Sequence, residues 1–133
     1  MPFSTTITPD GTGILRTGRG LVTGADLLAA DSELLHATEK ELQQIRYGLV
    51  DFSEVTELRV TSDDVRLLAR LAERLSELNT EFIAAIVAPR DDSSGLSRMW
   101  QVLAENTGWS SHVFRDRAGA IAWLLERVPG LKL

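Results

Sequence analysis

Tyr47-Gly-Leu-Val-Asp-Phe-Ser-Glu-Val55 is the stretch from which the fold can be derived. Its side chains are almost all apolar from Leu49 to Phe52, which is typical of a strand covered on both faces of a sheet. The next segment, Arg59-Val-Thr-Ser-Asp-Asp64, predicts a loop that leads into a helix with Ser62 as its N-cap. In open α/β sheets, functional residues concentrate at this carboxyl end of a central strand.

The segments after this stretch alternate between helix and strand. A strongly amphipathic helix begins near Ser62, and its apolar residues recur at helical spacing at Val65, Leu68, Ala69, Ala72 and Leu75. A second buried strand, Phe82–Ala88, ends at Pro89, and residues 90–95 form a loop that leads into another helix. Gly108 is predicted to end that helix.

The chain closes with a strand and a helix. Residues 110–115 predict an edge strand in which His112 and Val113 face opposite sides. Asp116 is expected to cap a last helix, which ends at Pro129-Gly130.

The segments before the central stretch predict a hairpin and a helix. Residues 3–8 form a strand, Pro9-Asp10-Gly11 a turn, and residues 14–17 a second strand. Thr23 and Asp26 resemble a capping box for a helix that runs to about Thr38. Residues 39–46 are charged and predict a short helical turn before the central strand.

The order of these elements predicts a single α/β domain over residues 1–133. Its sheet is mixed and mainly parallel, with about five strands, and four helices flank it.

Composition excludes several classes of function. The net charge of -5 argues against nucleic-acid binding, which needs a basic footprint. The absence of cysteine removes disulfides, thiolate catalysis and cysteine-ligated metals. No apolar segment approaches the roughly 20 residues that span a bilayer, and no secretory signal is visible. We therefore expect a cytoplasmic protein without a membrane span.

No set of residues predicts a catalytic centre. Gly18-Arg-Gly-Leu-Val-Thr-Gly24 matches neither phosphate-binding glycine signature and is interpreted as the end of a strand and the start of a helix. Asp51 is either a structural acceptor of backbone N–H groups or a catalytic acid, and the structural role is favoured. His36 and His112 lie on different elements. We expect neither an enzyme nor a bound cofactor or metal.

The pattern resembles the STAS superfamily. The similarity rests on Leu49-Val-Asp-Phe-Ser-Glu-Val55 followed by Val60-Thr-Ser-Asp-Asp-Val65, and later segments resemble its SpoIIAA-like branch. These later segments are Ile86-Val-Ala-Pro89, Leu96-Ser-Arg-Met99, Val113-Phe-Arg-Asp116 and Ala120-Ile-Ala-Trp-Leu124. The superfamily includes bacterial anti-sigma-factor antagonists and the cytoplasmic domains of sulfate transporters. The resemblance therefore implies a non-catalytic regulatory or protein-interaction module.

The resemblance also implies a position for the interaction site. Ser62 is the nearest match to the serine that is phosphorylated in the antagonists, although their Asp-Ser-Ser-Gly motif is replaced here by Val60-Thr-Ser-Asp63. The string Asp92-Ser-Ser-Gly-Leu96 spells that motif after a different strand, and we interpret it as a chance match. The residues expected to form an interaction or phosphorylation site are Asp51, Ser53, Thr61, Ser62 and Asp63.

Two further hypotheses stay open. The first is a small-molecule or lipid-binding domain, in which helix N–H groups and nearby arginines bind an anionic group. Its residues would be Arg90, Ser93, Ser94, Gly95 and Arg98. The second is a homodimer formed through the apolar stripes of the two C-terminal helices, where Trp100 and Trp123 are core or interface residues. The protein partner itself is not identified by the sequence.

Overall fold

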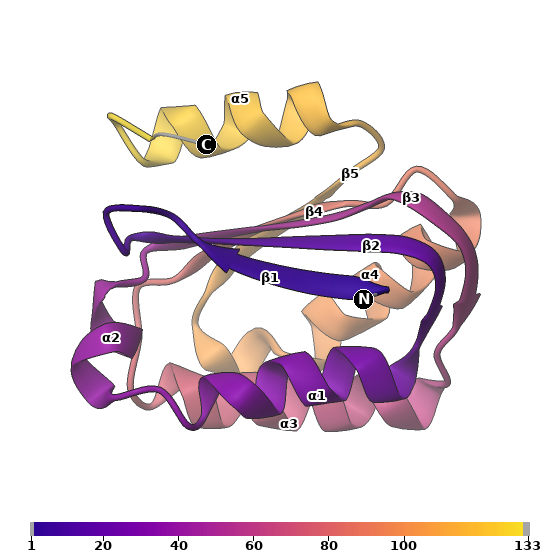
Figure 1. The fold of residues 1–133 in the computed structure, drawn as a ribbon, viewed down its shortest axis with the longest axis horizontal. Coiled ribbons are helices and arrows are strands. Elements are labelled where there is room, and N and C mark those ends of the chain that lie inside the picture. The colour runs from indigo at the N-terminus through magenta and orange to yellow at the C-terminus, as the bar shows by residue number, and fades with distance from the viewer. Residues whose placement is uncertain (1, 132–133) are drawn as a thin grey trace.

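The computed structural model describes residues 2–131, in which a five-stranded sheet carries helices on both faces (Figure 1). The strands are β1 (Phe3–Ile7), β2 (Gly13–Thr23), β3 (Tyr47–Arg59), β4 (Ile83–Val87) and β5 (Ser110–Phe114). The helices are α1 (Gly24–Leu34), α2 (Glu39–Gln44), α3 (Ser62–Ser76), α4 (Asp91–Leu103) and α5 (Arg117–Arg127), and a 3₁₀ turn, η1 (Glu105–Thr107), follows α4.

The strands lie side by side in chain order. β1 pairs antiparallel with β2, and every other neighbouring pair is parallel. This confirms the predicted mixed, mainly parallel sheet. Crossovers between parallel strands are right-handed, so strands added successively in one direction place their crossover helices on one face. α1, α3 and α4 accordingly lie below the sheet in Figure 1, and α5 covers the other face.

Two strands are longer than the sequence predicts. β2 continues through the glycine-containing segment to Thr23, and β3 continues to Arg59, where a loop was expected. The two strands stay paired through register shifts between Thr17 and Arg19 and between Gly20 and Leu21. The bulges let β2 and β3 curve together toward α1 and α3, as Figure 1 shows.

Three helices begin with the same capping box. In each, the hydroxyl of a threonine accepts from the backbone N–H three residues later, and the acidic side chain of that later residue accepts from the threonine backbone N–H. The threonines are Thr23, Thr38 and Thr61. The N-cap of α3 is therefore Thr61, and the prediction of Ser62 was wrong by one residue because Asp64 completes the box with Thr61. The capping box at Thr38 begins α2, a short fifth helix that lies between the end of α1 and the start of β3 in the chain.

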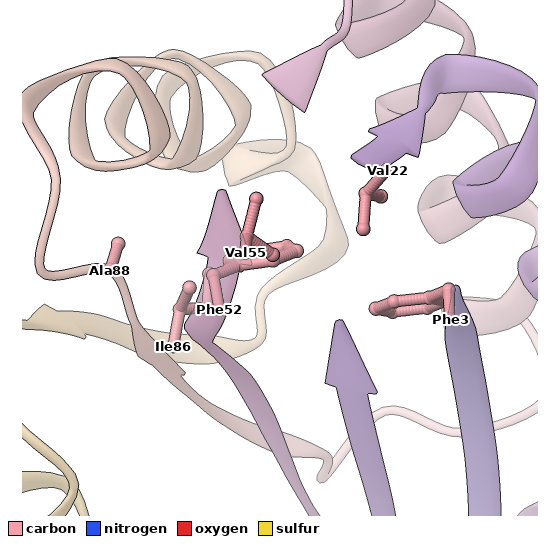
Figure 2. Packing of buried hydrophobic residues seen from close by; sticks show 6 residues of the cluster. All are labelled: Phe3, Val22, Phe52, Val55, Ile86 and Ala88. Carbon is pink, nitrogen blue, oxygen red and sulfur yellow. The ribbon is translucent and has the colours of Figure 1, made fainter. Parts of the chain in front are cut away.

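The core has a cluster on each face of the sheet, and a third, smaller cluster of Ala69, Ala72 and Ala104 joins α3 to the end of α4. Figure 2 shows the cluster on the α1 and α4 side, which consists of Phe3, Val22, Phe52, Val55, Ile86 and Ala88. The opposite cluster joins β3 and β4 to α5 and consists of Tyr47, Leu49, Ala85, Val87, Ala120 and Leu124. Successive residues of β4 thus alternate between the two clusters, as expected for a central strand.

Candidate ligand-binding site

An apolar cavity of about 170 Å³ lies between the sheet and the layer formed by α1, α3 and α4. The sheet contributes seven apolar side chains to its wall: Phe3, Ile14, Val50, Phe52, Leu58, Ala84 and Ile86. The helices contribute a second apolar group: Leu27, Leu34, Val65, Leu68, Ala72 and Leu96. The cavity therefore occupies part of the volume that a close-packed core would fill on this face.

Short side chains create part of this space. Ala84 on β4, Ala72 on α3, and Ser93 and Ser97 on α4 all line the cavity, and all four are buried. None of them extends more than one heavy atom past Cβ. The side chains around this space lack the packing contacts that a filled core would give them.

One ion pair interrupts the apolar wall. Arg16 on β2 and Asp31 on α1 both line the cavity, and their side chains are 10% and 16% exposed. The Nη1 of Arg16 donates to Asp31 Oδ1, and Nη2 donates to the carbonyl oxygen of Ala30 at 3.2 Å. The guanidinium carbon lies 5.9 Å from the centroid of the Phe3 ring. The Arg16 Nε–H is buried and has no acceptor among residues 2–131.

Sequence reasoning missed Arg16 and Asp31, although a signal was present. Arg16 lies at every second position with Ile14 and Gly18 on β2, and both of these residues are buried. Arg16 therefore points to the same, inward side of the strand. A charged residue at such a position requires a buried partner. The partner, Asp31, is 15 residues away on another element, and its identity follows only from the fold.

Asp51 makes its polar contacts on the opposite face of the sheet. Its Oδ1 accepts from the Ser53 backbone N–H at 2.8 Å, and its Oδ2 lies 2.9 Å from Nη1 of Arg117 at the start of α5. Burial alone would raise the pKa of Asp51, but the hydrogen bonds from Ser53 and the Arg117 charge outweigh it and lower that pKa below 3.8. The carboxylate thus ties the β3 bulge to α5.

Replacement of Asp51 by asparagine is expected to lower the free energy of unfolding by about 1–2 kcal/mol at neutral pH, because a charged hydrogen bond is lost. A carboxyl whose pKa is lower in the folded state than in the unfolded state stabilises the fold at pH values above the unfolded-state pKa. This stabilisation is lost as the pH falls through the folded-state pKa. The difference between wild type and variant should therefore persist at neutral pH and shrink below pH 3.8. Urea denaturation at a series of pH values measures it, and a difference that stays constant down to pH 2 contradicts this assignment.

The other residues of the predicted interaction site are exposed. Thr61, Ser62 and Asp63 form the start of α3, where Asp63 pairs with Arg66 at 2.7 Å. Ser53 is exposed on β3. Because Asp51 bonds to α5 and α3 covers the opposite face of the sheet, the structure does not bring Asp51 together with Thr61–Asp63.

The residues of the predicted anion site lie in a helix rather than a loop. α4 begins at Asp91, so the expectation of a loop over residues 90–95 was wrong. Ser93 and Ser94 are 1% and 2% exposed, and Gly95 is exposed. Arg90 donates to the Thr56 carbonyl oxygen and to Asp92, and Arg98 lies 3.5 Å from the Ser94 hydroxyl. Asp91 and Asp92 place negative charge in the first turn, which opposes an anion there.

The two histidines lie apart, as predicted. His36 is exposed in the turn after α1, and His112 contacts Phe114 and Trp123 on the α5 side, with ring centroids 4.6 Å and 6.0 Å away. Within residues 2–131, no three side chains of the metal-binding types come together. No helix in this part of the chain is both long and apolar enough to cross a bilayer.

The tryptophans divide between the two faces. Trp100 and Trp109 line the cavity, and the Trp109 indole N–H donates to the Asn79 carbonyl oxygen at 2.7 Å. Trp123 instead lies on α5, under the guanidinium of Arg127 at 4.3 Å. All three tryptophans nevertheless line a second pocket, together with His112 and Arg127.

A mixed sheet in chain order, crossover helices on one face and a single C-terminal helix on the other define a SpoIIAA-like α/β fold. The chain is similar to the crystal structure of an uncharacterized protein of the DUF3478 family, described as having a SpoIIAA-like fold, from Shewanella loihica PV-4. The two share 21% sequence identity over 92% of this chain and 91% of that one, with a TM-score of 0.54. No protein-family model and no curated protein matches the sequence. This similarity supports the predicted fold.

Proposed function

We propose that the protein is a non-catalytic binding module that holds a small apolar molecule in the cavity between the sheet and α1, α3 and α4. The observation that carries the proposal is the cavity itself, of about 170 Å³ with an almost wholly apolar lining. Apolar cavities of this size take up small apolar molecules. A bound molecule would recover contacts that the empty wall lacks.

The proposed small-molecule site is therefore the interior cavity rather than the start of α4 that the sequence suggested. Ser93, one of the residues predicted from the sequence, lines the cavity, whereas Arg90 is engaged by Thr56 and Asp92 outside it. Binding through an anionic group at Ser93–Gly95 stays a prediction, and the surroundings of the interior cavity favour an apolar ligand instead.

Toluene is a probe of suitable size for testing the cavity. We expect saturable binding in isothermal titration calorimetry and an increase in Tm with toluene concentration, because a ligand of the folded state alone stabilises it. Replacing Ala84 by leucine places three more carbon atoms in the cavity wall and should weaken toluene binding at least tenfold. The same change at Ala122, which is exposed on α5, serves as the control. Equal binding by the wild type and both variants would refute the cavity as the site.

A regulatory protein-interaction role is the second candidate, and a feature of β3 supports it. The last pair between β3 and β4 joins Asp51 to Val87, and no strand of the described chain pairs with that side of β3 from Phe52 to Arg59. Such an edge can accept an extended segment of a partner. The predicted residues Ser53 and Thr61–Asp63 are exposed at the two ends of this segment.

Ser62 provides the test of this second role, since it is exposed in the first turn of α3. We expect Ser62→Arg to abolish recovery of a specific partner in affinity purification, because a long cationic side chain would obstruct the surface. Glu126→Arg, on the exposed side of α5, should leave recovery intact. Unchanged recovery with Ser62→Arg would move the docking surface elsewhere.

Self-association and location stay predictions. Val102 on α4 and Leu125 on α5 are 68% and 49% exposed, which supports an apolar contact between copies through the C-terminal helices. Light scattering across micromolar concentrations tests it, and a constant monomer mass would exclude the dimer. A cytoplasmic location rests on the sequence expectation alone.

A further inference from the structure

We propose that the cavity selects a neutral, single-ring molecule whose oxygen atom accepts a hydrogen bond from the Arg16 Nε–H. This inference rests on the proposed ligand-binding function and adds the chemical class of the ligand. It assigns to Arg16 a recognition role in addition to its ion pair with Asp31.

The size of the cavity limits the ligand to about one ring. An engineered apolar cavity of about 150 Å³ in another protein binds benzene, and the cavity here measures about 170 Å³. Rings also fit its walls, because Phe52 from β3 and Trp100 from α4 line it together with Phe3 from β1. Aromatic side chains favour offset or edge-on contacts with a ligand ring.

The requirement for an oxygen comes from the unsatisfied donor. Two of the three nitrogens of the Arg16 guanidinium have acceptors, in Asp31 and in the Ala30 carbonyl. The third nitrogen, Nε of Arg16, is buried, and its N–H has no hydrogen-bond acceptor in the described chain. A buried donor left unpaired is costly, and an acceptor supplied by the ligand removes that cost.

The requirement for neutrality comes from Asp31. Its carboxylate already balances the Arg16 charge at the cavity wall. A second anion would be repelled by Asp31 and would lose its hydration in apolar surroundings. A ketone, aldehyde or ether oxygen meets the Nε–H without either penalty.

Three probes of nearly equal size separate these requirements. Acetophenone carries a carbonyl oxygen, α-methylstyrene replaces that oxygen by a methylene group, and benzoate carries a negative charge. Calorimetry on the full chain should show acetophenone binding about tenfold more tightly than α-methylstyrene, as expected for a hydrogen bond from a charged donor. Benzoate should bind at least tenfold more weakly than acetophenone.

Changes at Arg16 test whether its Nε–H makes the distinction. Arg16→Lys keeps a cation that can pair with Asp31 but has no donor at the Nε position, so the preference for acetophenone should fall below about twofold. Should the lysine variant fail to fold, the double change Arg16→Met and Asp31→Leu should show the same loss of preference. A tenfold preference that survives these changes would overturn the assignment to Arg16.

The outcomes separate the two proposals. Equal binding of acetophenone and α-methylstyrene by the wild type would overturn the recognition role of Arg16 and leave the cavity as a site. Tighter binding of benzoate would overturn the requirement for a neutral ligand. Failure of all three probes, and of toluene, would refute the cavity itself as a binding site.

Discussion

Replacement of Arg16 by methionine is expected to lower the free energy of unfolding by about 3–5 kcal/mol. Removal of one partner of a buried ion pair leaves the other charge buried without compensation. Here that charge is Asp31, whose side chain is 16% exposed and whose bonded partner is the Arg16 guanidinium. The charge on Asp31 would then face an apolar cavity wall. Urea denaturation followed by tryptophan fluorescence measures the loss.

The double variant Arg16→Met and Asp31→Leu is the matched comparison. Replacing a buried ion pair by apolar residues of similar size is often neutral or stabilising. We therefore expect its free energy of unfolding to lie within about 1 kcal/mol of the wild-type value. The coupling between the two sites would then account for most of the loss in the single variant. A double variant as unstable as Arg16→Met alone would show that the cost comes from lost packing at Arg16.

This comparison bears on why the cavity contains an ion pair at all. A buried salt bridge is weak evidence for stability, because the cost of desolvating two charges can exceed their attraction. If the apolar double variant is as stable as the wild type, stability does not explain Arg16 and Asp31. Recognition of an oxygen atom by the unpartnered Nε–H would explain the pair, and the probe measurements address that separately.

The strands and the mixed, mainly parallel sheet could be predicted because they depend on local patterns. The apolar run of β3 and the run before Pro89 in β4 each mark a strand buried on both faces. Helical periodicity after Thr61 marks α3. Once helices alternate with strands, the right-handed crossover rule leaves few sheet topologies. The similarity to a SpoIIAA-like structure supports the same fold.

The cavity could not be predicted because it depends on volumes that no local pattern records. The spacing of Ala72 and Ala84 predicts that they are buried, but the gap that they leave depends on the distance between α3 and the sheet. The Arg16–Asp31 pair likewise depends on how α1 lies against β2. At the start of α3, Thr61 and Ser62 are adjacent residues that both suit an N-cap, and one-residue errors at helix ends are common.

A leucine at Ala84 and a leucine at Ala85 are expected to have different effects on stability, although the two alanines are neighbours on β4. Ala85 is fully buried in the tightly packed cluster under α5. Three additional carbon atoms there should lower the free energy of unfolding by about 1–3 kcal/mol or more, because overpacking displaces neighbouring side chains. Ala84 faces the cavity, so the same change should leave stability unchanged or raise it by up to about 2 kcal/mol.

Comparison of Ala84→Leu with Ala85→Leu separates the effect of the cavity from the effect of the added atoms, because both variants add the same atoms to the same strand. Denaturant unfolding of the ligand-free protein measures both values under identical conditions. Equal destabilisation by the two leucines would mean that the α1, α3 and α4 side of the sheet is as closely packed as the α5 side. The space for a ligand would then not exist in solution. A stable Ala84→Leu variant with weakened toluene binding would instead show that the added side chain occupies the volume the ligand uses.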